Sequence, residues 1–361
     1  MLTARGPWAV VFLGLGFVAA VAVTAGIVCW LVPPYDHVAA AELADPVATP
    51  PPERTTLDAT AALSALRSTT STSTSTTTTT IPPEPRQATL AFTGDLIPHQ
   101  PVVRTADAAS AEGWDFRPMF QEVAPILSGA DLAICHLETP LSVDDPSPSR
   151  FPTFDAPRAL AEAARDSGYD GCSTASNHAY DQGAAGVEET MRVMEETGLA
   201  QAGMANTGIA DIAPVLYDAN GISVAHISAT YGLNGFALPP DRPYLVDLID
   251  PEEIIAEAAI ARESGAELVV VSLHWGSEYR SEPTDAQVAW LDQLLPAAEI
   301  DLVVGHHAHV VQPVDKLGDE WVVFGLGNFL SNQSQACCGA ASQDGMIATV
   351  QILETSPGTI E

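Results

Sequence analysis

Basic residues are scarce in this chain of 361 residues, which carries 14 lysines and arginines against 46 aspartates and glutamates, for a formal charge of −32. Lysine occurs once, as Lys316. Ten basic and forty acidic residues follow position 86, so that part alone carries a charge of about −30. A surface of that sign repels phosphate backbones and anionic lipid headgroups, which argues against nucleic acid as a partner. An anionic polymer would need bound cations to screen it.

Aromatic residues make up only 6% of the chain, and no sugar-stacking platform is evident. Cysteine is also rare, and none of the five cysteines is arranged as Cys-x-x-Cys, which argues against a zinc site built from cysteines. Cys29 lies in an apolar run, whereas the other four form an even set with three possible pairings. Cys135 and Cys172 each lie in a strand-like run just before candidate site residues, so a disulfide between them is one expectation.

An uncharged apolar run of 25 residues extends from Trp8 to Val32. As a helix it would be about 37 Å long, enough to cross a hydrocarbon core of about 30 Å. Arg5 is the only basic residue before it, which favours residues 1–7 in the cytoplasm and the rest of the chain outside. We expect a single-pass anchor in the cell membrane at residues 8–32. The alternative is a cleaved signal peptide, with small residues at 39–41 as the cleavage region.

Residues 33–87 are rich in proline, threonine, serine and alanine, with an unbroken serine and threonine run from Ser68 to Thr80. Such a segment cannot bury enough apolar area to offset its chain entropy, so it is expected to be a disordered linker. The linker separates the anchor from a folded domain predicted for residues 88–361.

Within this domain, apolar strand-like runs alternate with helical patterns, which predicts an α/β fold with helices packed on a sheet. The first strand is expected at 88–92, closed by Thr93-Gly94-Asp95. Further strands are expected at 131–135, 171–174, 222–227, 267–273, 302–304, 321–324 and 346–352. Helices are expected at 117–128, 157–167, 184–198, 251–264 and 284–297.

Side chains that can bind metal follow five of these strands. They are Asp95 and His99; His136 and Glu138; Asn177, His178 and Asp181; His274 and Glu278; and His306, His307 and His309. Each alone is common in turns and helix caps, but ligands of open α/β sheets bind beyond the carboxyl ends of the strands. Their coincidence therefore predicts a metal site. Within His307-Ala308-His309, alternate positions of an extended chain would point two imidazoles the same way.

Six motifs in this order resemble the CapA/PgsA family of capsule and poly-γ-glutamate synthesis proteins, over residues 88–352. They are Phe92-Thr93-Gly94-Asp95, His136-Leu137-Glu138-Thr139-Pro140-Leu141, Ser176-Asn177-His178-Ala179-Tyr180-Asp181-Gln182-Gly183, His274-Trp275-Gly276-Ser277-Glu278-Tyr279, Gly305-His306-His307-Ala308-His309-Val310-Val311-Gln312 and Gly325-Leu326-Gly327-Asn328-Phe329. The family is similar to calcineurin-like metallophosphoesterases. The resemblance implies a sandwich of two mixed β-sheets flanked by helices.

The resemblance also implies two divalent metal ions, of Mn, Fe or Zn, which suit a mixture of carboxylate and imidazole ligands. The implied ligands are Asp95 and His309 for the first metal, Asn177, His274 and His307 for the second, and Glu138 between the two. Such a pair, about 3.5–4 Å apart, activates water and neutralises a substrate oxygen. His178 would donate a proton to the leaving group, oriented by Asp181.

The chain departs from the metallophosphoesterase pattern at several positions. The Asp-x-His motif is absent, since His99 lies four residues after Asp95. Glu138 stands where phosphoesterases commonly use aspartate and reaches one carbon further. His136 stands where the family often has asparagine, and His306 is interpreted as a bystander. Trp275 and Tyr279 are the aromatic residues expected near the site, with a core role equally open for Trp275.

Two functions follow from these patterns. The first is an anchored, extracytoplasmic, metal-dependent hydrolase of capsule or poly-γ-glutamate biosynthesis, or a phosphoesterase unrelated to capsule. The second is a non-catalytic component that handles an anionic polymer during envelope assembly. The expected partners are an anionic envelope polymer or phosphoester substrate and other membrane proteins of polymer synthesis.

Overall fold

The computed structural model describes residues 85–111, 113–142, 149, 151–356 and 359–360. The predicted N-terminus at 1–7, the anchor at 8–32 and nearly all of the linker at 33–87 lie outside these residues. Among the helices that are described, none has both the length and the apolar character needed to cross a membrane.

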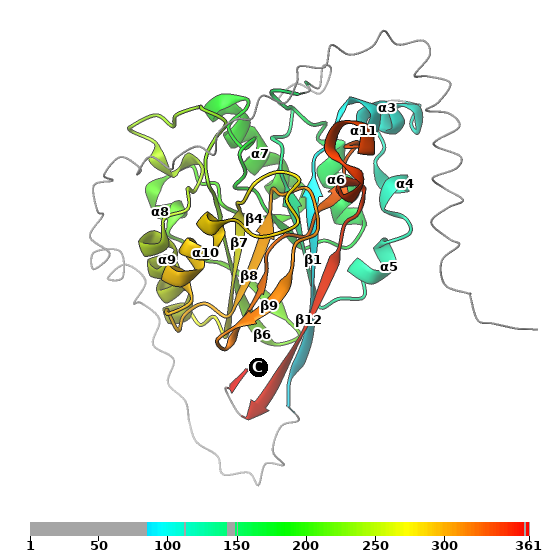
Figure 1. Ribbon diagram of the computed structural model, residues 1–361. Helices are drawn as coiled ribbons and strands as arrows, with labels where there is room; N and C mark the ends of the chain where they lie inside the picture. The colour runs from blue at the N-terminus through cyan, green and yellow to red at the C-terminus, as the bar shows by residue number, and fades with distance from the viewer. Residues whose placement is uncertain (1–84, 112, 143–148, 150, 357–358, 361) are drawn as a thin grey trace, which may run out of the picture. The chain divides into compact units, whose positions relative to one another are not determined.

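The described strands form two mixed sheets, which confirms the expected α/β architecture (Figure 1). The first sheet has the order β13-β12-β1-β2-β3-β4, with β11 paired to β1, and the second has the order β5-β6-β7-β8-β10-β9. The strands of the first sheet are β1 (Gln87–Leu96), β2 (Leu132–Leu137), β3 (Gly171–Ser173), β4 (Ala200–Ala202), β11 (Asn328–Leu330), β12 (Ile347–Ser356) and β13 (Thr359–Ile360). Those of the second are β5 (Val215–Ala219), β6 (Ile222–Thr230), β7 (Leu268–His274), β8 (Leu302–His306), β9 (Val314–Leu317) and β10 (Glu320–Val323).

Alternation along the strands places the main core between the two sheets. Leu90 and Phe92 of β1 face Val270 of β7 and Val304 of β8 across this layer. Neighbouring positions such as Ala91 point outward and pack under helices. One face of the first sheet packs against the second sheet and the other packs under helices. Because β1 and β2 are therefore buried on both faces, their sequences are nearly continuous apolar runs.

Helices cover the outer face of each sheet, so that the fold has four layers (Figure 1). The helices packed on the first sheet are α3 (Gln100–Ala108), α4 (Arg117–Phe120), α5 (Ala124–Leu127), α6 (Ala159–Asp166) and α7 (Gly183–Thr197). The second sheet is covered by α9 (Pro251–Glu263) and α10 (Asp285–Leu294). Smaller elements are α8 (Gly208–Asp211), α11 (Gln335–Cys338), η1 (Pro243–Leu245) and η2 (Ala340–Gln343).

Two local predictions were wrong. The single helix expected at 117–128 is two short helices, α4 and α5. Pro125 has no N–H to donate to the carbonyl of residue 121, and its ring clashes with that carbonyl, so the helix is interrupted. The turn expected at Thr93-Gly94-Asp95 is absent, because β1 continues to Leu96, where it pairs with both β2 and β11.

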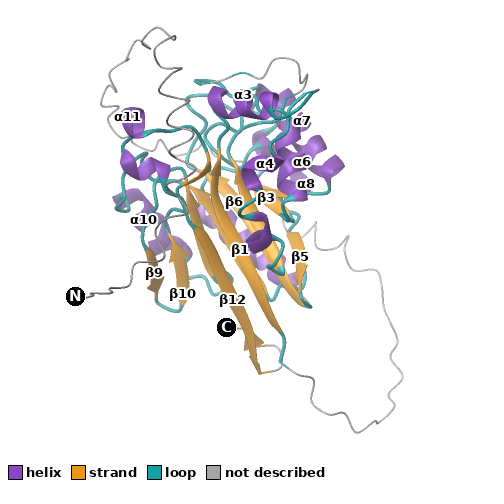
Figure 2. Cartoon of the chain, turned by 90° about the vertical axis from the view of Figure 1, so that its right-hand side faces the viewer, coloured by secondary structure: helices purple, strands orange, loops and turns teal. Residues whose placement is uncertain are grey.

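Arg86 ties the start of β1 to both sheets at the end opposite the carboxyl ends of the parallel strands. Its guanidinium donates to Glu267, just before β7, at 2.6 Å and to Glu354 of β12 at 2.8 Å. A further bond at 2.6 Å reaches the carbonyl of Gly221. Figure 2 shows β1 and β12 side by side along their length, with the C-terminus at this same end.

His226 is a buried titratable group in β6, a strand that contains no Asp, Glu, Lys or Arg. Its Nε2 lies 2.9 Å from Ser272 Oγ, and burial lowers its pKa from 6.5 to about 3. The unfolded chain therefore binds a proton between pH 6.5 and 3 that the folded chain does not, so folding stability falls as the pH falls through this window. The slope from this group approaches about 1.4 kcal/mol per pH unit.

We expect His226→Gln to flatten the pH dependence of the free energy of unfolding between pH 6.5 and 4, measured by urea denaturation with chelator present. Glutamine does not titrate and can still bond to Ser272. Parallel profiles for the two proteins would contradict the assignment to His226.

Candidate metal centre

Strand register brings the predicted ligands to one end of the sandwich. In the first sheet, Asp95 of β1 lies opposite His136 of β2, and Glu138 follows β2 directly. In the second sheet, His274 ends β7 and lies opposite His306, which ends β8. Because these strands are parallel within each sheet, their polar ends form one buried group between the two sheets.

The first part of this group contains Asp95, Glu138 and His309. His309 Nδ1 lies 3.0 Å from Asp95 Oδ2, and its Nε2 lies 3.6 Å from Glu138 Oε1. Asn328 Oδ1 lies 3.1 Å from the same Nδ1 of His309. Asp95 and Glu138 are completely buried. None of their four carboxylate oxygens accepts a well-aligned hydrogen bond, and their close contacts are with the imidazoles of His306 and His309.

The second part contains Asn177, His274 and His307. His274 Nε2 donates a hydrogen bond of 3.0 Å to Asn177 Oδ1, and a cation bound between them would take the place of that proton. The ring centroids of His274 and His307 are 4.6 Å apart. One ligand atom from each of Glu138, His274 and His307 lies within 4.8 Å of the others, as holds for Asp95, Glu138 and His309. Glu138 belongs to both sets, which is the position expected of a bridging carboxylate.

His178 and Asp181 form a close pair next to Asn177. Asp181 Oδ2 lies 2.7 Å from His178 Nδ1 and accepts a second bond, also 2.7 Å, from the backbone N–H of Phe154. The Phe154 ring packs edge-on against the His178 ring, with centroids 4.7 Å apart. The imidazole is thus held in one orientation with Nε2 pointing away from Asp181, which a proton donor requires.

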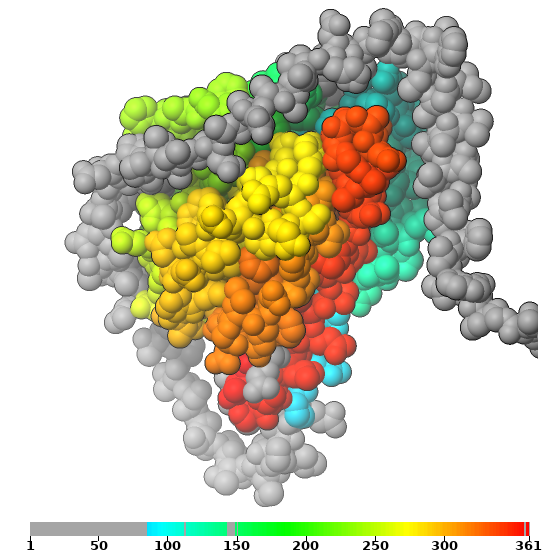
Figure 3. All heavy atoms as spheres, viewed as in Figure 1, coloured from blue at the N-terminus to red at the C-terminus, as the bar shows by residue number. Residues whose placement is uncertain are grey.

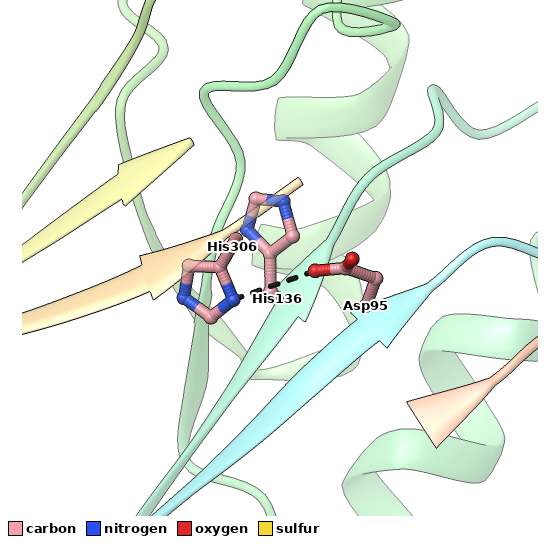
Figure 4. A group of neighbouring side chains, drawn as sticks. All are labelled: Asp95, His136 and His306. Atoms are coloured by element: carbon pink, nitrogen blue, oxygen red, sulfur yellow. Dashed lines mark ion pairs between the residues drawn. The ribbon is translucent and has the colours of Figure 1, made fainter. Parts of the chain in front are cut away.

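His306, which the sequence interpretation set aside as a bystander, lies within the buried group. Its Nδ1 lies 3.5 Å from Asp95 Oδ1, as the dashed line in Figure 4 marks. The His306 ring stacks on the His136 ring, with centroids 4.1 Å apart and planes 13° from parallel. One ligand atom from each of Asp95, His136 and His306 lies within 4.8 Å of the others, so these three residues are a further group that could hold a metal ion.

His136 orients His274. Its Nε2 lies 2.8 Å from His274 Nδ1, and its Nδ1 lies 2.8 Å from Ser173 Oγ. This chain of contacts occupies Nδ1 of His274 and leaves its Nε2 facing Asn177. Histidine ligands of metals usually have their other ring nitrogen held in this way.

His99 lies to one side of the group. Its Nδ1 is 3.0 Å from the carbonyl of Ile97, and its ring packs edge-on against Phe154. Burial lowers its pKa to about 4. The contacts of His99 therefore do not include Asp95, whereas His306 lies beside it.

The backbone carrying the last two predicted ligands is left-handed. His307 and His309 have φ values of 85° and 54°. Such values are uncommon for residues other than glycine and concentrate at functional sites. The two imidazoles therefore reach the group through a tight turn after β8 and not, as predicted, through alternation in an extended chain.

On the face shown in Figure 3, the loop after β7, in yellow, lies beside the segment around α11, in orange-red. Gln333 connects them: its Nε2 donates to the Tyr279 hydroxyl at 3.1 Å, and its Oε1 accepts from Asn328 Nδ2 at 2.9 Å. Tyr279 lies near the group, as expected, with its ring centroid 6.0 Å from that of His309. Trp275 is fully buried in the core under the second sheet.

Some residues of the site were missed by sequence reasoning. Tyr231 packs against His274 and His307, and Asn328 contacts His309. Asn328 lies in one of the six family motifs, so its signal was present without a role. Tyr231 has no such signal, because only the pairing of β6 with β7 brings it there.

The expected bond between Cys135 and Cys172 is present and links β2 to β3 one position before His136 and Ser173. Cys337 and Cys338 form the second disulfide.

The two buried carboxylates of the group are stabilised by nearby positive charge. Burial raises the pKa of Glu138. Burial alone would also raise that of Asp95, but the imidazoles of His306 and His309 hold the Asp95 pKa below its ordinary range. For His309, burial is outweighed by Glu138 and Asp95, which raise its pKa to about 10. A protonated His309 thus partly neutralises two buried carboxylates.

Divalent metals fit this group. Buried carboxylates without hydrogen bonds are costly unless a cation or donor offsets their charge. The Nδ1 atom of His307 is also buried and without a partner. The mixture of carboxylate, carboxamide and imidazole donors suits Mn, Fe or Zn. The structure therefore defines an α/β sandwich with a buried histidine and carboxylate cluster that could bind metals.

The family model described as "Bacterial capsule synthesis protein PGA_cap" matches residues 89–333, more than half of the chain. The chain belongs to this family. It is 27% identical over 259 residues to the capsule biosynthesis protein CapA of Bacillus anthracis, covering 69% of this chain and 61% of that protein. It is also 27% identical to the PGA biosynthesis protein CapA of Bacillus subtilis, over 67% of this chain and 63% of that protein. The chain thus spans about three fifths of the length of these relatives.

A similar solved structure is the calcineurin-like phosphoesterase YfkN of Bacillus subtilis. It is 13% identical, with a TM-score of 0.44, over 77% of this chain and 88% of that one.

Proposed function

We propose that this chain is a metal-dependent hydrolase of capsule or poly-γ-glutamate biosynthesis, acting on an anionic envelope polymer or a phosphoester. The observation that carries the proposal is the set of four buried carboxylate oxygens of Asp95 and Glu138, which lack hydrogen bonds and are ringed by imidazoles. Membership of the capsule synthesis family supports the biological setting.

The proposed ligands are those implied by the sequence, divided between two cations. Asp95 and His309 would hold the first, Asn177, His274 and His307 the second, and Glu138 both. Two divalent cations there would supply Lewis acidity to a phosphoryl or amide oxygen and make water a better nucleophile at neutral pH.

The residues of the chain have separate tasks around that centre. Asp181 keeps a proton on Nδ1 of His178, so that Nε2 can hold and release the proton that a leaving group needs. Phe154 excludes water from one face of the same ring. His136 would keep Nδ1 of His274 occupied through their 2.8 Å contact, so that Nε2 is the nitrogen left to bind a cation.

The location and partners form part of the same proposal. The apolar run at 8–32 would anchor the chain in the cell membrane, with the folded domain on the extracytoplasmic side. Other membrane proteins of polymer synthesis would be its neighbours. A domain charge of about −30 repels a polyanion, so bound cations would be needed at the point of contact.

A second candidate is a non-catalytic component that guides the polymer during assembly. The names of the Bacillus relatives, which refer to biosynthesis, favour it. The His178–Asp181 pair favours the hydrolase, since a purely structural metal site does not need a proton donor beside it.

We expect His178→Ala to retain two metals per chain and to lose about 10²–10⁴-fold in turnover, the usual contribution of a general acid. The measurement combines metal analysis with hydrolysis assays on phosphomonoester, phosphodiester and γ-glutamyl substrates. His99→Gln is the matched control, a half-buried histidine outside the group, and should keep both metals and most activity. A wild-type protein that binds two metals but hydrolyses none of these substrates would favour the assembly role.

A further inference from the structure

Tyr231 occupies a defined place beside the proposed second metal position. It is the first residue after β6, whose last residue Thr230 lies opposite His274 in the register of β6 and β7. The backbone N–H of Tyr231 donates to the carbonyl of His274 at 3.0 Å. Strand pairing therefore fixes the Tyr231 side chain next to the His274 imidazole.

The side chain of Tyr231 contacts all three second-metal residues other than Glu138. Its ring is almost parallel to that of His274, 7° apart with centroids at 6.3 Å, and lies 4.7 Å from the His307 ring. Its hydroxyl lies beside the Asn177 side chain. Within the described part of the chain, its ring contacts do not include His309, a ligand of the first position.

These contacts restrict the motions that would spoil a ligand set. A ring packed against His274 and His307 limits rotation of both imidazoles. A hydroxyl beside the Asn177 carboxamide limits rotation of that group, whose Oδ1 lies 3.0 Å from His274 Nε2. The amide could otherwise present either end, because its oxygen and nitrogen are nearly the same size. Burial raises the pKa of Tyr231 to about 12, so the hydroxyl keeps its proton at neutral pH.

We propose that Tyr231 is a positioning residue that pre-arranges Asn177, His274 and His307 and thereby sets the affinity of the second metal position, while the first is assembled without it. This inference rests on the proposed metal-dependent function. In this proposal, one side chain that binds neither cation sets the affinity of the second metal position and not that of the first.

The same loop provides a matched control. Asn234 lies three residues after Tyr231, and its Nδ2 is 3.3 Å from His178 Nδ1. Asn234 therefore contacts the proposed proton donor and not the second-metal residues. Asn234→Ala disturbs the same loop and should leave the binding of both metals unchanged.

The test is titration of the metal-free, full-length protein with Mn²⁺, followed by calorimetry and by Mn²⁺ electron paramagnetic resonance. Tyr231→Phe removes only the hydroxyl and should weaken the second Mn²⁺ about 10-fold, and Tyr231→Ala should weaken it about 100-fold, in the range of changes to groups that orient ligands. The first Mn²⁺ should keep its wild-type affinity, and the spin coupling between two neighbouring Mn²⁺ ions should be lost.

The possible results distinguish failure of this inference from failure of the proposed metal-dependent function. A wild-type protein that binds fewer than two Mn²⁺ ions overturns the proposed two-metal centre and the inference with it. A wild type with two ions and variants that also bind two at unchanged affinity overturn the inference alone, as does an equal loss at both positions. If Tyr231→Ala does not fold, Tyr231→Phe decides by the same criteria.

Discussion

Glu138→Gln is expected to abolish tight metal binding at both positions. A carboxylate oxygen of Glu138 lies within 4.8 Å of ligand atoms of Asp95 and His309, and the same holds for His274 and His307. The charge of Glu138 and its second oxygen could therefore serve both cations. Changing a group that merely orients a ligand costs about 10–100-fold in affinity, and loss of a bridging carboxylate should exceed about 100-fold. Calorimetric titration with Mn²⁺ and Zn²⁺ measures the effect.

The same variant should have the opposite effect on the metal-free protein. Glu138 is fully buried, neither oxygen has a hydrogen bond, and burial raises its pKa. Removing that charge relieves a desolvation cost. Urea denaturation with chelator present should therefore show Glu138→Gln to be more stable than wild type, whereas saturating metal should reverse the order.

Glu278→Gln is the control for charge alone. Glu278 is exposed, although its carboxylate can approach His307 and His309. We expect it to change metal affinity far less than Glu138→Gln. Equal losses in the two variants would contradict a bridging role for Glu138.

Gly94→Ala is expected to cause the largest loss of stability of any substitution considered. A Cβ at Gly94 would lie 1.9 Å from the carbonyl oxygen of Gly327 and 2.8 Å from its carbon. Both contacts are with backbone that the Asp95 N–H holds through a 3.0 Å bond to the same oxygen, so neither side can move cheaply. Overpacking of cores costs about 1–3 kcal/mol, and this case should exceed about 3 kcal/mol.

The free energy of unfolding from urea denaturation tests this expectation. Gly232→Ala is the control, since nothing lies within 4 Å of a Cβ there. It should change stability by less than about 1 kcal/mol. Metal affinity should also fall in folded Gly94→Ala, because Asp95 is displaced with its neighbour. A Gly94→Ala protein as stable as wild type would show that β1 and the Gly327 segment are not packed as described.

The candidate metal-binding residues could be predicted because they follow apolar strands in the sequence. Asp95, Glu138, Asn177 and His274 each come just after or at the end of a buried run, and the strand ends of parallel sheets meet. The roles assigned to these residues remain predictions, since proximity alone does not show a bound cation.

The position of His306 was not predictable by the same reasoning. Alternation in an extended chain would turn His306 away from its two neighbours. The backbone instead becomes left-handed at His307, and β8 keeps His306 opposite His274, facing Asp95. Local sequence does not reveal such a change of backbone hand, because it is imposed by the surrounding packing.

The elements that escaped prediction are mostly short. β4 and β11 have three residues each, too few to show a periodic pattern, and they form because neighbouring strands offer free hydrogen-bonding edges. β11 matters for the site nonetheless, since its first residue, Asn328, contacts His309. Tertiary pairing thus supplied a site residue where local propensity was silent.

The Arg86 contacts have a consequence for how the domain is presented. Arg86 joins both sheets where β1 begins, whereas Asp95 lies nine residues further along the same strand, a distance of about 30 Å. Any support to which the preceding residues attach therefore connects to the pole of the sandwich opposite the metal-binding residues. β1 thus runs from the ion pairs of Arg86 at one end of the sandwich to Asp95 of the metal-binding group at the other.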